Sequence, residues 1–175
     1  MLTTIGRKPK TAGDLVAHLL ECHERIRTFV RIAESAGRRD DLDRESVIEA
    51  CSRSERYFIR AFPLHIEDEE KSILPRLLEP AAAPSLELRE ALHTMEQQHG
   101  EHEPRVRVLL ETLSAVRAEP ERTELRAALA RVAAELATAF EEHLVLEERV
   151  VFPAVRRLPS ETQARIQEEM RGRRR

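Results

Sequence analysis

The chain has 175 residues, of which 41% are apolar, 35% are charged and 3% are aromatic, and its formal net charge is -3. This length suffices for one domain with a core that needs no disulfide, and the charge gives no general attraction to nucleic acid or anionic lipid. The first residues lack the apolar region of a signal peptide, and no apolar run approaches the roughly 20 residues of a membrane span. The sequence therefore predicts a cytoplasmic protein without a nucleic-acid or membrane partner.

The composition, with only five glycines, is typical of long amphipathic helices. The first predicted helix opens with a capping-box pattern at residues 11–14 and ends near Gly37. Its apolar residues recur at steps of three and four, which is the period of a helix face. They are Leu15, Leu19, Cys22, Ile26, Phe29 and Ala33.

Three more long helices follow. The second is predicted to begin after Asp43 and to run past Pro75, and the third to begin after Ser85. The chain turns again near Pro120 before the fourth. Short connections favour antiparallel neighbours, so the prediction is an all-α, up-down-up-down four-helix bundle over residues 11–158.

The ends of the chain are assigned separately. Residues 1–10 are predicted to be a tail, and residues 159–175 a short extra helix with a solvated basic end. A second capping box at residues 160–163 would start that helix, which is expected to reach about Met170. Within the bundle, Pro63 and Pro104 each remove a backbone hydrogen bond and are expected to bend or break their helices.

One sequence motif of 15 residues occurs twice in the chain. Residues 61–75 and 139–153 both read A-F-x-x-H-x-x-x-E-E-[KR]-x-[IV]-[LF]-P. Positions i and i+4 share one face of a helix, so His65 with Glu69, and His143 with Glu147, each present an imidazole and a carboxylate together. This spacing predicts one pair of metal ligands on the second helix and one on the fourth.

The first and third helices add His23, His99 and His102 near their apolar faces. A single histidine there is more often a packed core residue, and a Glu-Glu pair is more often solvated. Three imidazoles alone would also suit zinc or copper. Two carboxylates with four or five imidazoles instead suit a pair of redox metals that keeps an open coordination position. Burying these groups together would be costly unless a cation offset their desolvation, which favours a metal site.

With these residues the chain resembles the hemerythrin-like family, also called the HHE cation-binding domain, over roughly residues 11–158. The resemblance implies a non-haem centre of two iron ions with an oxo or hydroxo bridge. It implies that Glu69 and Glu147 bridge the irons, and that the terminal nitrogen ligands are His23, His65, His99 and His143.

The third helix departs from the oxygen-carrier pattern, in which two histidines stand four apart. Here His99 and His102 stand three apart, and Glu103 occupies the place of the second histidine. His99 is ranked first as a ligand and His102 second, with Glu103 as an alternative carboxylate. The carrier's H-x-x-x-x-D is also replaced by His143-x-x-x-Glu147, which argues against dedicated oxygen carriage.

Other reactive side chains receive structural interpretations. His18 could be an outer ligand but is predicted to be a packed or outer-sphere imidazole. Tyr57 could approach the metals but is predicted to be a core residue. Cys22 and Cys51 have no metal or redox spacing and are predicted to be small buried side chains, and His93 is placed on the surface.

The resemblance implies binding of, or reaction with, O2, peroxide or nitric oxide. A monomer and a homodimer both stay open, since an exposed apolar residue or two would permit a dimer. A dry pocket shielded by Phe62, Phe140, Leu74 and Phe152 would favour reversible binding of small ligands, and a peroxide- or NO-directed activity stays open. The alternative is an iron-sensing or iron-storage module whose metal occupancy controls a partner. A ferritin-like oxidase is disfavoured because Glu-x-x-His occurs only at residues 96–99, and a zinc protease because His-Glu-x-x-His is absent.

Overall fold

The computed structural model describes residues 14–175. Helix α1 (Leu15–Arg38) begins after Asp14, whose side chain accepts a hydrogen bond of 3.0 Å from the backbone N–H of Val16. Asp14 is thus the N-cap that satisfies one of the free donors at the start of the helix. The predicted tail and the first three residues of the capping box lie outside the described residues.

The bundle has four long helical members, here called rods. Helix α1 is the first rod, and the second is made of several consecutive helical segments. It consists of α2 (Arg44–Arg60), α3 (Phe62–Asp68), a π-helical turn (Glu69–Ile73) and α4 (Leu74–Leu78), and a 3-10 turn (Pro80–Ala82) follows it. The third rod is α5 (Leu86–Ala118). The fourth is α6 (Thr123–Leu146), a second π-helical turn (Glu147–Val151) and α7 (Phe152–Arg157).

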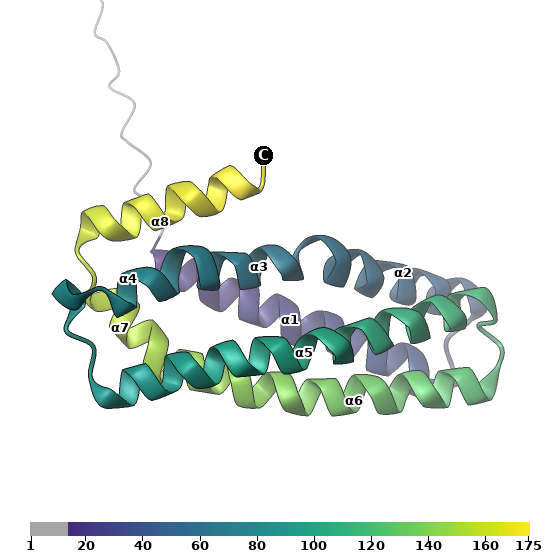
Figure 1. Ribbon diagram of the computed structural model, residues 1–175. Helices are drawn as coiled ribbons and strands as arrows, with labels where there is room; N and C mark the ends of the chain where they lie inside the picture. Colours follow the sequence, from purple (N-terminus) through teal and green to yellow (C-terminus); the bar gives the residue numbers. More distant parts are fainter. Residues whose placement is uncertain (1–13) are drawn as a thin grey trace, which may run out of the picture.

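The four rods pack side by side into one closed bundle. Helix α1 packs against α2 and α6, and α5 packs against the same two, as Figure 1 shows. Helix α8 (Ser160–Arg173) lies outside the bundle across the α3 end of the second rod. Residues 14–175 contain no strand, so the predicted all-α bundle with an extra C-terminal helix is confirmed. None of their helices is long and apolar enough to cross a membrane.

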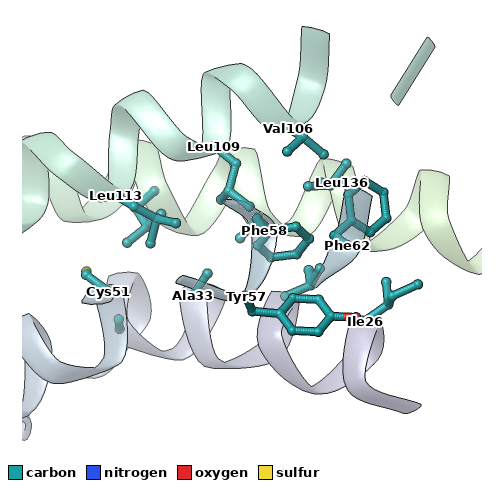
Figure 2. Close-up of a cluster of buried hydrophobic side chains, with 14 of the residues drawn as sticks. Ile26, Ala33, Cys51, Tyr57, Phe58, Phe62, Val106, Leu109, Leu113 and Leu136 are labelled. Carbon is teal, nitrogen blue, oxygen red and sulfur yellow. The ribbon is translucent and has the colours of Figure 1, made fainter. Parts of the chain in front are cut away.

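Two apolar clusters fill the bundle, one toward each end. The first, shown in Figure 2, includes Ile26, Phe58, Phe62 and Leu109 and lies where α2 and the C-terminal half of α5 meet. The second lies at the α8 end and includes Leu15, Leu19, Ile73, Met95, Phe152, Ile166 and Met170. The stretch of each rod that separates the two clusters carries the polar residues described below.

Gly37 permits the closest approach between rods. A Cβ atom at this position would lie 2.6 Å from the backbone nitrogen of Ala130 and 2.6 Å from the carbonyl oxygen of Arg126. Real Cβ atoms do not come so near to backbone. Glycine is therefore required here for α1 to pack on α6.

Several local predictions can be compared with the structure. Asp43 and Ser85 cap α2 and α5 through their side chains, as predicted. The helix also breaks at Ala61, just before Pro63. The second capping box is wrong, because Pro159 is the N-cap of α8 and no side chain caps it. The helix through Pro104 is continuous, so no break occurs there.

The basic end of the chain is not a solvated tail. Helix α8 extends to Arg173, and both Arg173 and Arg174 form ion pairs with the buried carboxylate of Asp68. The prediction failed because Asp68 lies more than one hundred residues earlier in the chain, and sequence periodicity does not report such a contact.

Candidate metal centre

Each rod carries its candidate ligands at the same depth. His23 lies between Leu19 of one apolar cluster and Ile26 of the other, and the same alternation holds on the other three rods. Six of the seven predicted ligands meet in this layer, all with at most 5% of their surface exposed. They are His23, His65, Glu69, His99, His143 and Glu147.

These six side chains form two groups that share both carboxylates. His23 and His65 belong to one group and His99 and His143 to the other, while Glu69 and Glu147 belong to both. Within each group, the four ligand atoms all lie within 4.8 Å of one another. The duplicated motif thus contributes one histidine and one shared carboxylate per copy.

Each carboxylate directs one oxygen to each histidine pair. Glu69 places Oε1 3.2 Å from Nε2 of His65 and Oε2 3.3 Å from Nε2 of His99. Glu147 places Oε2 3.0 Å from Nε2 of His23 and Oε1 3.3 Å from Nε2 of His143. Two carboxylates therefore span two sets of donors, each set with two nitrogens and two oxygens.

The donor atoms fit cations better than they fit one another. None of the four carboxylate oxygens has a hydrogen-bond partner within residues 14–175, and neither do Nε2 of His23, His65 and His99. Leaving so many buried polar atoms unpaired would be costly. Two donors each about 2.1 Å from one octahedral cation, at right angles, are about 3.0 Å apart, which matches the observed spacings.

Outer hydrogen bonds orient three of the four imidazoles. Nδ1 of His23 donates to Glu148 at 2.9 Å, and Nδ1 of His99 donates to Glu70 at 3.0 Å. Nδ1 of His143 donates to the side-chain oxygen of Gln98 at 3.0 Å. When such a ring is neutral, its proton is held on Nδ1 and the Nε2 lone pair faces the centre.

The outer carboxylates were missed from sequence. Glu70 and Glu148 are the second glutamates of the two Glu-Glu pairs, and a pair of this kind usually marks a solvated surface. Each instead reaches a histidine on a different rod. Arg27 further holds Glu148 with a hydrogen bond of 2.9 Å. The recurrence of both glutamates in both copies was the available signal.

A π-helical turn begins at each shared carboxylate. The backbone N–H of Leu74 donates to the carbonyl of Glu69, five residues earlier, and that of Phe152 donates to Glu147 in the same way. Pro75 and Pro153 follow directly, and neither can donate the hydrogen bond of an α-helix. Such widened turns are rare and occur mostly at functional sites. The repeated proline was the sequence signal for them.

Burial and mutual repulsion perturb the protonation of the metal-free site. Burial, together with the charge of Glu69, raises the pKa of Glu147 to about 8, and burial raises the pKa of Glu69 as well. Burial lowers the pKa of His143 to about 2 and that of His65 well below its usual value. Burial also opposes protonation of His99, but the negative charge of the adjacent Glu69, with that of Glu147, outweighs burial and raises this pKa to about 9. A bound cation would take the place of the protons that Glu147 and His99 hold because of their raised pKa values.

The two remaining third-helix candidates lie apart from this constellation. His102 is buried with its Nδ1 unpartnered among the described residues, and its ring packs edge-on against His143 at 5.1 Å, but it belongs to neither ligand group. Burial lowers the pKa of His102 to about 4, so the ring is neutral. Glu103 is exposed and pairs with Arg107 at 3.0 Å, so it is not the substitute carboxylate.

The other reactive residues take structural positions. Tyr57 stacks on Phe29 with ring centroids 4.4 Å apart in the first apolar cluster. His18 is half-buried beside α8, and neither it nor Tyr57 belongs to a ligand group. Cys22 and Cys51 are buried free thiols, and His93 is exposed, as predicted. Phe152 packs against the His23 ring at 4.8 Å.

A four-helix bundle with buried histidines and shared glutamates in its core defines a metal-binding bundle protein. The chain belongs to the hemerythrin family, because the model for the hemerythrin HHE cation-binding domain matches residues 14–155. A second match covers residues 90–173, which carry the second copy of the motif. No curated protein matches the chain.

Proposed function

We propose that this protein holds two iron ions, one between His23 and His65 and the other between His99 and His143, with both carboxylates shared. We further propose that the pair binds or reacts with O2, peroxide or nitric oxide. The observation that carries the proposal is the division of the Glu69 and Glu147 oxygens between the two histidine pairs.

The donor set favours iron over the common alternatives. Each position has two imidazole nitrogens and two carboxylate oxygens. Structural zinc sites are usually closed tetrahedra and catalytic zinc sites keep three protein ligands, whereas histidine-carboxylate sites with open positions on a six-coordinate ion are typical of non-haem iron. Four protein donors per octahedral ion leave room for a small ligand. Bound iron would supply the redox change and the open coordination positions.

The surrounding residues control what reaches the ions. Phe140 packs edge-on against His102 at 4.9 Å, and Phe62 packs against Phe140 at 5.2 Å, so apolar rings exclude bulk water on that side. Glu70, Glu148 and Gln98 keep the imidazoles in one tautomer. Neutral His102 lies next to the pair His99 and His143, where its ring would form a hydrogen bond with a small ligand.

The test is anaerobic loading with ferrous ion, followed by elemental analysis and absorption spectra. We expect two irons per chain, and near-ultraviolet and visible charge-transfer bands after exposure to O2 that change on addition of azide. His93→Gln, which alters an exposed histidine, serves as the matched control and should behave as the wild type. One zinc per chain, or aerobic iron loading without such bands, would overturn the proposal.

The competing function is an iron-sensing or iron-storage module whose metal occupancy controls a partner. One observation supports it, namely the buried donor atoms without hydrogen-bond partners. Binding at these atoms would stabilise the folded bundle, because they have no partners within the described residues otherwise. Thermal melts of metal-free and iron-loaded protein, each with and without O2, separate the two. A melting temperature that responds to iron but not to O2 favours the sensing function.

A further inference from the structure

Helix α8 contacts the bundle through a buried ion pair next to a shared carboxylate. Arg173 donates to Oδ1 of Asp68 at 2.7 Å, and Arg174 donates to Oδ2 at 2.6 Å. Asp68 is fully buried and directly precedes Glu69 in the chain. Two guanidinium groups therefore compensate one buried carboxylate, which fixes the backbone that carries Glu69.

The same helix holds the rest of the first π-helical turn. Arg173 donates to the hydroxyl of Ser72 at 2.7 Å, and Ser72 donates to Glu169 at 2.6 Å. Glu169 also forms an ion pair with Arg76, whose guanidinium donates to the backbone carbonyl oxygens of Lys71 and Ser72. We call Asp68, Ser72, Glu169, Arg173 and Arg174 the C-terminal clamp. The clamp contacts the π-helical turn Glu69–Ile73 at Asp68, directly before the turn, and at Ser72, within it.

The second copy of the motif has no such clamp. The positions equivalent to Asp68 and Ser72 are Leu146 and Val150, which are apolar. The two halves of the centre are therefore supported differently, although their ligand atoms are arranged alike.

His65 is the ligand that lacks other support. Both of its nitrogens are without a hydrogen-bond partner in the described part of the chain, whereas the other three imidazoles each have an outer partner at Nδ1. Its orientation thus depends on the backbone of α3 and of the turn that the clamp holds. Its ring otherwise packs edge-on against His23 at 5.3 Å.

We propose that Arg173 and Arg174 are positioning residues for the metal centre. By holding Asp68 they fix His65 and Glu69, and retention of the ion at the His23 and His65 position depends on them more than retention at the other position. This inference rests on the proposed function, because it requires two bound ions.

The experiment compares release of iron from two double variants of the full chain under excess chelator. Arg173→Gln with Arg174→Gln removes the clamp. Arg165→Gln with Arg171→Gln removes the same charge from more exposed positions on α8, since Arg165 has only a surface pair at 3.7 Å and Arg171 forms no ion pair within residues 14–175. We expect the clamp variant to lose one iron per chain about 10- to 100-fold faster, with the second iron and the control near wild-type rates.

Further variants separate positioning from a merely structural role. Arg173→Lys with Arg174→Lys keeps both charges and should restore slow release, and Asp68→Asn should reproduce the fast release of one iron. Adding His65→Gln to the clamp variant should leave the one slowly released iron in place. Equal acceleration of both irons, alongside a matching fall in the melting temperature of metal-free protein, would overturn the inference, as would unchanged release. A wild-type chain that binds no iron pair would instead refute the proposed function.

Discussion

Nδ1 of His23 lies 2.9 Å from Oε1 of Glu148, the residue that follows the shared carboxylate Glu147. One Glu-Glu pair on the fourth rod thus provides a shared donor and also orients a histidine on the first rod. Glu69 and Glu70 do the same for His99 on the third rod. The repeat therefore positions its own ligands and those of the two unrepeated rods.

Removing an orienting carboxylate should weaken metal binding without removing a ligand. We expect Glu148→Ala to lower iron affinity about 10- to 100-fold, because His23 would lose the acceptor that fixes its tautomer. Glu70→Ala should have a smaller effect, since Glu70 is 42% exposed against 26% for Glu148. Anaerobic iron titration measures both. Glu142→Ala, an exposed change next to His143, is the control, and an equal loss there would contradict the explanation.

The third rod offers a direct comparison of two histidines three residues apart. His99→Gln should reduce bound iron to one ion per chain or less, because Nε2 of His99 faces Oε2 of Glu69. His102→Gln should retain both ions, because His102 belongs to neither ligand group. Elemental analysis after gel filtration checks the two contents. If the two variants lose iron equally, His102 is a fifth nitrogen ligand.

Metal affinity should rise with pH up to about pH 9. Glu147, whose folded pKa is about 8, and His99, whose pKa is about 9, both hold protons at neutral pH and must lose them to bind a cation. Each released proton makes the apparent affinity rise about tenfold per pH unit. Titration calorimetry in two buffers of different ionisation enthalpy counts the protons. An affinity independent of pH between 6 and 8 would contradict it.

The metal-free protein should lose stability on both sides of neutrality. The raised pKa of Glu147 contributes stability that is present below its unfolded value of about 4.5 and is lost as pH rises through about 8. The lowered pKa of His143 acts in the opposite direction, with stability present above about 6.5 and lost as pH falls. Thermal melts from pH 4 to pH 9 should show both declines. Iron loading should abolish the alkaline one.

Two glycines should respond oppositely to the same substitution. Gly37→Ala should destabilise the bundle by about 1–3 kcal/mol, since the new methyl group would meet the α6 backbone. Gly100→Ala has open space around it in α5 and should stabilise the protein by about 0.5–1 kcal/mol through helix propensity. Denaturant unfolding of both proteins measures these values. A stabilising Gly37→Ala would refute the close approach of α1 and α6.

The rods could be predicted from sequence because their apolar residues keep the helical period, and Asp43 and Ser85 are N-caps with a local mechanism. The doubled motif likewise placed His65 and Glu69 on one face. The π-helical turns did not follow from the apolar period, since each spans only five residues and is too short to show a period of its own. The clamp at Asp68 and the role of Glu148 depend on contacts between distant segments, which local patterns do not report.

The layer of ligands between the two apolar clusters has a consequence for how the molecule unfolds. The two apolar clusters are separate, and the polar layer between them is the natural boundary between two cooperative units when no cation is bound. A cation that bonds to all four rods would join those units. By amide hydrogen exchange, the metal-free protein should show two classes of protection, one for each end of the bundle, and the metal-bound protein only one. The bound metal would thus make the whole bundle unfold as a single cooperative unit.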